Sequence, residues 1–288
     1  MIPLILSILS SSVLLVIFKY FDKFKVQTFQ AITINYIVAA GLGFLMTPVS
    51  LHPYQIIAKP WALSALIIGS SFIGVFYLMA LSSQKVGVAV SSVANKMSLV
   101  IPVTAGFILY NESLAGLKIL GILLAIVAVT LVTIRKSDGV KLEKKYLFLP
   151  ILIFLGSGYL DTFLKYVQTV QLGEGEIEVF SASLFVIAAT IGSFILLGKR
   201  IFKGKTVETK SIVAGFALGI PNYFSIHFLL NALNLPNLES TVVFPINNTG
   251  IVLVSTFLAI LLFSERLSKL NWIGISLAVV SIALIAIA

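Results

Sequence analysis

The sequence contains no cysteine, and only 11% of its 288 residues carry a charge. The absence of cysteine excludes a disulfide framework, a Cys-ligated zinc site and a cysteine nucleophile. Soluble domains carry charge on roughly a quarter of their residues, because their surface faces water. A chain with so few charges does not cover a water-soluble globule, so its apolar residues are expected to face lipid.

Motifs that define several other function classes are also missing. The sequence has no Gly-rich phosphate loop with its lysine, which argues against ATP-driven transport by this chain alone, and no His-Glu-x-x-His zinc motif. A membrane aspartyl protease needs two intramembrane aspartates, and only Asp161 lies well inside an apolar segment. We therefore expect no enzymatic activity, no metal and no cofactor.

The net charge of +9 does not indicate a nucleic-acid partner. The basic residues lie in short connections between apolar segments, where Lys and Arg usually set membrane orientation. They concentrate in the odd-numbered connections, and the even-numbered ones hold little beyond Lys59, Lys118 and Lys165. The positive-inside rule then places the odd-numbered connections in the cytoplasm and both termini outside.

Long apolar runs dominate the chain, in which 59% of residues are hydrophobic and mean hydropathy is +1.08. A helix needs roughly 20 predominantly apolar residues to cross the hydrocarbon core, whereas barrel strands would be short and alternating. The sequence therefore predicts an all-α, multi-pass protein of a bacterial cytoplasmic membrane with about ten transmembrane helices. The predicted segments lie near residues 3–21, 28–47, 60–82, 87–110, 115–134, 147–168, 177–198, 211–232, 239–262 and 270–287.

The two halves of the chain repeat each other weakly. Leu109-Tyr110-Asn111-Glu112-Ser113-Leu114 matches Leu262-Phe263-Ser264-Glu265-Arg266-Leu267, and Gly121 and Gly274 follow at the same distance beyond each Glu. Chance similarity between apolar segments is the alternative, but the shared Glu-plus-Gly spacing favours a true duplication.

The duplication divides the chain into two five-helix repeats, at residues 1–134 and 147–288, joined by a basic linker at 135–146. An odd number of helices per repeat places the two halves in opposite orientations. This inverted arrangement is common in secondary transporters.

In these motifs the chain resembles the ten-helix EamA-type branch of the drug/metabolite transporter superfamily. The resemblance implies a basket of two inverted repeats around a central cavity, which moves amino acids, other metabolites or drugs by alternating access. It also implies cytoplasmic termini, the reverse of what the basic residues indicate. That family usually has Gly before the Glu, where Asn111 and Ser264 stand here. The stretches that carry the resemblance are Phe76–Leu81, Pro102, Asn111–Leu114 with Gly121, and Ser264–Leu267 with Gly274.

Lys96 is the leading candidate for a functional charge. A charge at the centre of a spanning helix costs roughly 2.5–3.5 kcal/mol, so each one is a functional hypothesis by default. Lys96 lies in the middle of segment 87–110, roughly 14 Å from the start of that helix at 1.5 Å per residue. We predict a fixed positive charge for an anionic or zwitterionic substrate. A structural lysine paired between helices is the alternative.

Polar residues elsewhere in the two halves extend this prediction. Asn247 and Asn248 occupy about the repeat-equivalent position of Asn95 and Lys96. Matched polar positions in both halves suggest a site at the repeat interface, although Asn is also typical of hydrogen bonds that hold helices together. The predicted substrate-binding residues are Asn35, Tyr77, Asn95, Lys96, Asn247 and Asn248.

Asp161 and His227 are the candidates for coupling to a proton. Asp161 lies within segment 147–168, where desolvation favours the neutral form of a carboxyl group. Its alternative role is a favourable pair with Lys165 one helical turn later. His227 is the only histidine in a predicted spanning segment, and a satisfied structural hydrogen bond is its alternative role.

Three prolines lie inside predicted helices, at Pro102, Pro221 and Pro245. Each removes a backbone hydrogen bond and favours a kink, which suits either a hinge for alternating access or a static bend.

Together these features predict a secondary transporter, a permease or exporter that moves a small molecule across the bilayer. The alternative is a non-transporting membrane scaffold or receptor, which would not need a lysine at mid-membrane. Because both repeats lie in one chain, we expect a monomer, or a homodimer.

Overall fold

In a computed structural model of the protein, the described residues are 1–46, 53–85, 94–110, 116–133, 146, 148–204, 206–236, 238–263 and 268–287. Within these ranges all regular secondary structure is helical and there is no strand, which confirms the all-α prediction. The repeat motifs at 111–114 and 264–267, and residues 135–145 of the basic linker, lie outside the described ranges.

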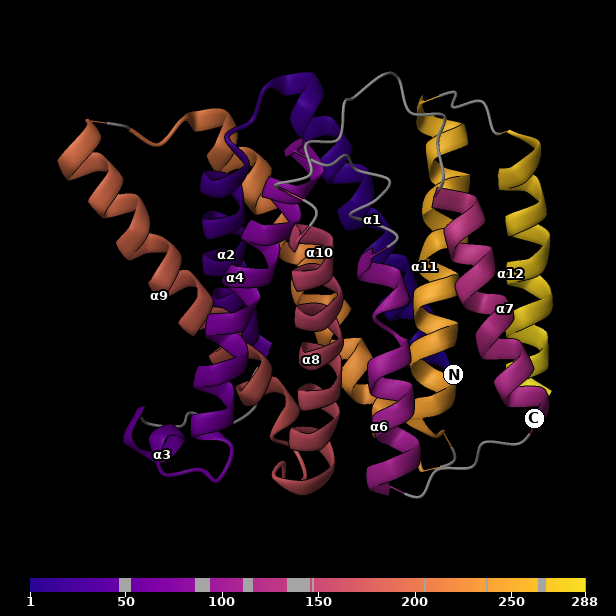
Figure 1. The fold of residues 1–288 in the computed structure, drawn as a ribbon. Coiled ribbons are helices and arrows are strands. Elements are labelled where there is room, and N and C mark those ends of the chain that lie inside the picture. Colours follow the sequence, from indigo (N-terminus) through magenta and orange to yellow (C-terminus); the bar gives the residue numbers. More distant parts are fainter. Residues whose placement is uncertain are drawn as a thin grey trace. The chain divides into compact units, whose positions relative to one another are not determined.

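The helix bounds follow the apolar segments closely (Figure 1). Among the described residues, six helices are long and apolar enough to span a membrane, at Thr28–Met46, Ala62–Met79, Phe148–Val170, Ile177–Phe202, Thr209–Leu233 and Ser240–Leu262. The chain therefore has the character of a multi-pass helical membrane protein. The helices are α1 (Ile2–Phe24), α2 (Thr28–Met46), α3 (Pro53–Ile57), α4 (Ala62–Lys85), α6 (Val100–Tyr110), α7 (Gly116–Thr133), α8 (Phe148–Val170), α9 (Ile177–Lys203), α10 (Thr209–Leu233), α11 (Ser240–Phe263) and α12 (Lys269–Ile287).

Three local features differ from the predicted segments. The short helix α3 was not predicted, because five residues are too few to produce a periodic pattern. Helix α9 continues to Lys203, past the predicted end at 198, and Gly204 terminates it with a left-handed φ of 62°. The predicted helix 87–110 is interrupted by a turn at 98–99.

Pro102 explains that interruption. Proline has no backbone N–H, so it cannot bond to the carbonyl of Ser98 four residues earlier. The N–H of Ile101 donates to that carbonyl instead, at 2.9 Å, in a tighter three-residue turn. The helical turn that carries Lys96 is thereby separated from α6.

The chain forms two compact units, and each takes helices from both halves of the sequence. Unit 1 comprises Met1–Gly74 and Tyr166–Asn234, and unit 2 comprises Val75–Lys165 and Leu235–Ala288.

In unit 1, α10 packs on α2 through two glycines one helical turn apart. A Cβ on Gly215 would lie 2.6 Å from the Ile34 Cβ, and one on Gly219 would lie 2.6 Å from the Val38 Cβ and 2.8 Å from the Asn35 carbonyl oxygen. Small residues spaced in this way let helix backbones approach closely in membranes. Gly215 and Gly219 therefore set α10 directly against α2.

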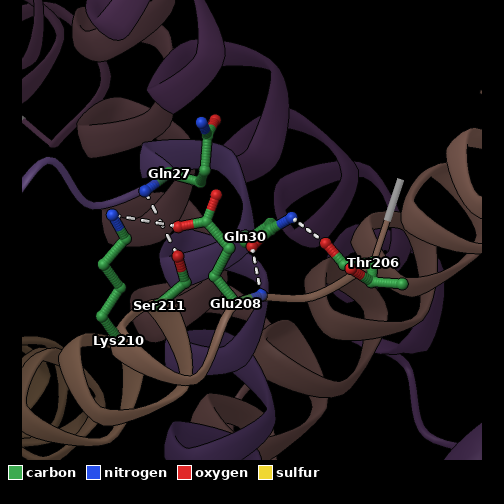
Figure 2. A network of polar contacts seen from close by, with 6 residues as sticks. All are labelled: Gln27, Gln30, Thr206, Glu208, Lys210 and Ser211. Carbon is green, nitrogen blue, oxygen red and sulfur yellow. Dashed lines mark hydrogen bonds and ion pairs between the residues drawn. The ribbon is translucent and has the colours of Figure 1, made fainter. Parts of the chain in front are cut away.

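A polar network fixes the start of α10 beside the start of α2 (Figure 2). The Gln30 side chain donates to the Thr206 carbonyl at 2.9 Å and accepts from the Glu208 N–H at 3.0 Å. The Gln27 N–H donates to the Ser211 hydroxyl at 3.2 Å. These bonds tie the connection between α9 and α10 to α2, and set the register in which Gly215 and Gly219 meet it.

Helices α2 and α9 of unit 1 pack antiparallel. Gly43, near the end of α2, faces Ala182 near the start of α9, where a Cβ on the glycine would come within 2.5 Å of the alanine Cβ. Gly192, in the second half of α9, faces Thr33 near the start of α2.

Helices α7 and α12 of unit 2 also pack antiparallel. Gly121, near the start of α7, faces Ile285 near the end of α12, with 2.6 Å between a Cβ built on the glycine and the Ile285 Cγ1. At the other end the Asn271 amide donates to the Leu131 carbonyl at 2.9 Å. The repeat glycine Gly121 is therefore a point of close helix packing.

Ion pairs join the ends of helices in both units. In unit 1, Glu176 accepts hydrogen bonds from Trp61 Nε1 and the Gly173 N–H, both at 2.9 Å, and pairs with Lys59 Nζ at 2.6 Å. Burial acts to raise the pKa of this carboxyl group, but the three donors outweigh it and hold the pKa below its usual value. In unit 2, the buried Lys118 pairs with Glu239 at 2.5 Å. Two of the lysines in even-numbered connections thus fasten helix ends.

Candidate functional site

The candidate site lies in unit 2 and begins with a hydrogen bond between its two halves. Lys96, in the helical turn 94–97 before α6, donates from Nζ to Oδ1 of Asn248 in α11 at 3.1 Å. Both residues were predicted to bind substrate, from about equivalent positions of the two repeats. Helices α6 and α11 pack against each other, which holds the two side chains in reach.

Asp161 of α8 adds the opposite charge. Its carboxylate is near enough to Lys96 for the two charges to interact electrostatically. Both side chains are half-buried, and they form no direct ion pair within the described part of the chain. The predicted alternative partner, Lys165, has its ammonium 5.7 Å from the centre of the Tyr110 ring.

A glycine brings α8 close to α6 at this point. Gly158 lies one turn before Asp161 and packs directly against the Ile101 side chain, leaving no space for a Cβ. The close approach of the two backbones places Asp161 beside the turn that carries Lys96. A larger residue at position 158 would separate the two charges.

The other predicted substrate-binding residues are divided between the units. Asn95 is half-buried next to Lys96, and its carbonyl accepts the Ser98 hydroxyl. Asn247 is buried, and its Oδ1 has no hydrogen-bond partner among the described residues. Tyr77 belongs to unit 2 and is exposed. Asn35 is buried in α2 and belongs to unit 1, whereas Lys96 belongs to unit 2.

The chemistry of the cluster follows from its three central groups. The Lys96 ammonium supplies donors and a positive charge, the Asp161 carboxylate supplies acceptors and a negative charge, and the Asn248 amide supplies both a donor and an acceptor. A molecule with a carboxylate and an ammonium group a short distance apart complements both charges. Proline lies close to the site on both helices, at Pro102 in α6 and Pro245 in α11.

His227 lies in unit 1, in α10, with Pro221 in the same helix. Its Nδ1 is 4.0 Å from Oε1 of Glu178 in α9, and Asn231 lies 3.2 Å from its Nε2. The structure thus gives His227 a carboxylate partner that no pattern in the sequence indicates. Groups of three or more His, Cys, Asp or Glu that could hold a metal are absent from the described residues.

Sequence reasoning also missed the roles of Glu176 and Glu239. Each directly precedes a spanning helix, where a carboxylate suits the positive end of the helix dipole, and that position was the available signal. Lys59 lies 117 positions before its partner Glu176, and Lys118 lies 121 positions before its partner Glu239. Sequence alone offers no sign of such pairings.

Comparison with known proteins identifies a relative by sequence and a solved structure with a similar fold. No family model matches the sequence. A Haemophilus influenzae protein described as uncharacterized is 30% identical over 280 residues, which cover 94% of this chain and 93% of that protein. A solved crystal structure has a TM-score of 0.79 at 14% identity, covering 99% of this chain and 96% of its own. At that identity the likeness concerns the fold alone.

Proposed function

We propose that this chain, which belongs to the same family as the Haemophilus influenzae protein, is a secondary transporter that moves a small zwitterionic or anionic metabolite across a bacterial cytoplasmic membrane. One observation carries the proposal: Lys96, Asn248 and Asp161 lie together in one unit of a chain built from membrane-spanning helices. Charges at membrane depth are expensive and are retained mainly where they serve substrates, ions or protons.

The arrangement suits a zwitterion. We assign the substrate carboxylate to the Lys96 ammonium and the Asn248 amide, and the substrate ammonium to Asp161. The 3.1 Å bond from Lys96 to Asn248 holds the two groups of the proposed carboxylate subsite side by side.

We further propose that the fold contains ten spanning helices as two inverted five-helix repeats. In such a fold, repeat mates that meet at the symmetry axis pack antiparallel. Helices α7 and α12, the fifth and tenth predicted segments, do so through Gly121–Ile285 and Asn271–Leu131. Helices α2 and α9, the second and seventh segments, do so as well.

Alternating access follows from this assignment. Each unit combines helices from both repeats, so either unit can act as a body that moves as a whole. The broken turn at 98–99 next to Lys96 supplies a flexible point at the substrate, since broken helices line the binding sites of many transporters. The predicted hinge role of Pro102 belongs to this proposal, as do those of Pro221 and Pro245.

The test is uptake by proteoliposomes of a panel of amino acids, organic anions and organic cations, with and without a pH gradient. We expect wild type to take up zwitterions, and Lys96→Met to reduce the initial rate about 10- to 100-fold, the equivalent of one hydrogen bond to a charged group. Lys210→Met, at an exposed ion pair in unit 1, is the control and should retain uptake.

The opposite results are equally specific. If the Lys96→Met variant takes up substrate as fast as wild type, Lys96 does not bind the substrate. No uptake of any panel compound by wild type would overturn transport of these classes, and would favour the scaffold or receptor function instead.

A further inference from the structure

A second polar cluster belongs to unit 1, whereas the Lys96, Asp161 and Asn248 side chains assigned to the substrate belong to unit 2. It consists of Glu178 in the first turn of α9 and of Tyr223, His227 and Asn231 in α10. The imidazole and the carboxylate are half-buried, with 16% and 23% of their side-chain surfaces exposed. A titratable pair held partly out of water within two apolar helices requires an explanation.

The hydrogen bonds of Asn231 define which imidazole nitrogen carries the proton. Asn231 Nδ2 donates to the His227 backbone carbonyl at 2.8 Å, so that atom is the amide nitrogen and not the oxygen. The same nitrogen lies 3.2 Å from His227 Nε2. Because an amide nitrogen only donates, Nε2 must accept, and the neutral ring carries its hydrogen on Nδ1.

That hydrogen is on the side of Glu178. Nδ1 lies 4.0 Å from Glu178 Oε1, and it has no hydrogen-bond partner among the described residues. The distance is longer than a hydrogen bond but short enough for strong attraction between an imidazolium and a carboxylate. A small movement of α9 relative to α10 would close the gap.

Packing fixes the ring in this position. The Tyr223 ring stacks on the imidazole with a centroid distance of 5.6 Å and an interplanar angle of 20°. Tyr223 is fully buried, and its ring also packs against Phe185 of α9 at 6.2 Å. The imidazole therefore has one nitrogen directed at Asn231 and the other at Glu178.

Among the side chains that the structure describes, no third charged group lies against His227 and Glu178. Helices α1, α2 and α9 pack against α10. The sequence of α2 has no charged residue, and α1 meets α10 through the Ser7 hydroxyl on the Ser225 carbonyl. The basic side chains of α1 belong to its other end, where Phe21 packs with Leu218.

The titratable groups that the structure places around the ring are therefore Glu178 from α9 and Tyr223 from α10 itself. The next carboxylate, Glu176, is occupied by Lys59, Trp61 and Gly173.

From this geometry we infer that Glu178 and His227 form a proton-binding site, with Asn231 and Tyr223 as positioning residues. A proton arriving at Nε2 converts the ring to imidazolium and removes the acceptor of Asn231. The Asn231 amide must then turn to present its oxygen, while the positive ring attracts Glu178. Proton binding is thereby linked to a change in the contact between α9 and α10.

The location suits exchange of protons with water. Glu178 lies at the beginning of α9, and His227 lies in the last two turns of α10, so both are near helix ends. In the proposed transporter this site would couple substrate movement to a proton gradient, and that role rests on the proposed function. Proton binding itself does not depend on it.

The chain offers a clean test because it has only two histidines, His52 and His227. We would label histidine with ¹⁵N in a His52→Gln protein in lipid nanodiscs, and record the imidazole nitrogen shifts from pH 5 to 9. The expected result is the Nδ1–H tautomer at high pH, conversion to imidazolium within this range, and a midpoint displaced by about one pH unit in Glu178→Gln. Glu174→Gln, an exposed loop residue, should leave the midpoint unchanged.

An Nε2–H tautomer, or equal midpoints in the wild-type and Glu178→Gln proteins, would overturn the proton site whether or not the chain transports anything. The coupling role has its own readout. With a panel compound that wild type transports, Glu178→Gln should lose accumulation driven by a pH gradient but keep exchange of labelled for unlabelled compound. Retained accumulation would overturn coupling, and absence of wild-type transport would overturn the proposed function while the titration still decides proton binding.

Discussion

The Lys96 ammonium donates a 3.1 Å hydrogen bond to the amide oxygen of Asn248, a residue 152 positions away. The two residues come from different halves of the sequence: Lys96 was identified as a charge inside a predicted spanning helix, and Asn248 by its place at about the equivalent position of the second half. Their hydrogen bond joins the first half of the sequence to the second. Replacement of either side chain removes the same hydrogen bond.

This contact predicts a specific pattern of stability. A hydrogen bond from a charged group contributes about 1.5–3 kcal/mol, so Lys96→Met and Asn248→Leu should each lower the thermal unfolding temperature of the purified protein. The unfolding temperature of the double variant should be no lower than that of the less stable single variant, because the shared bond is lost only once. Additive losses would show that the two residues act independently.

Asp161 predicts how the substrate range changes. Asp161→Asn removes the negative charge but keeps the size of the side chain, so uptake of zwitterions should fall about tenfold or more while uptake of simple organic anions persists or rises. Rates for paired compounds, with and without an amino group, measure this difference. An equal loss for both members of each pair would show that Asp161 supports the fold rather than the ammonium group.

The glycines of α10 predict an unusual response to alanine. Alanine is about 1 kcal/mol better than glycine in a helix, yet Gly219→Ala should lower thermal stability, because its Cβ would meet the Asn35 carbonyl oxygen at 2.8 Å. Gly41→Ala in α2 is the control, since no atom lies within 4 Å of its added Cβ. It should preserve or raise stability, and a similar loss in both variants would contradict the packing of α10 on α2.

Glu176 predicts a pH dependence with a definite sign. Its pKa is held below the unfolded value of about 4.3, so its stabilising contribution is complete above that value and is lost as pH falls through the folded pKa. Glu176→Gln should therefore lower the unfolding temperature at pH 7, and the difference from wild type should shrink below about pH 4. Glu174→Gln, two residues earlier and exposed, should show no difference at either pH.

The Lys118–Glu239 pair predicts a larger loss. Lys118 is only 3% exposed, so Glu239→Gln leaves a buried charge without its carboxylate. Removing one partner of a buried pair costs about 3–5 kcal/mol, although the exposure of Glu239 places this case at or below the lower end. The Lys118→Met and Glu239→Gln double variant should regain part of the lost unfolding temperature. No recovery would show that the two charges do not compensate each other.

Composition and apolar run length determined the class of this protein and the positions of its helices. Those features act locally, because a run of apolar residues long enough to cross a bilayer must satisfy its backbone hydrogen bonds within itself. Helix α8, for example, spans Phe148–Val170 against a predicted 147–168. Polarity within the predicted spanning segments likewise identified Lys96, Asp161 and His227 as candidates without any knowledge of their neighbours.

Only the tertiary structure decided which of these groups meet. The contacts of Lys96 with Asn248, Glu176 with Lys59 and Glu178 with His227 depend on which helices pack together and in which register. Glycines such as Gly158 and Gly219 set that register through close backbone approach. A lysine carries the same local signal whether its partner is a nearby carboxylate or a distant amide, so the choice emerges only when the helices assemble.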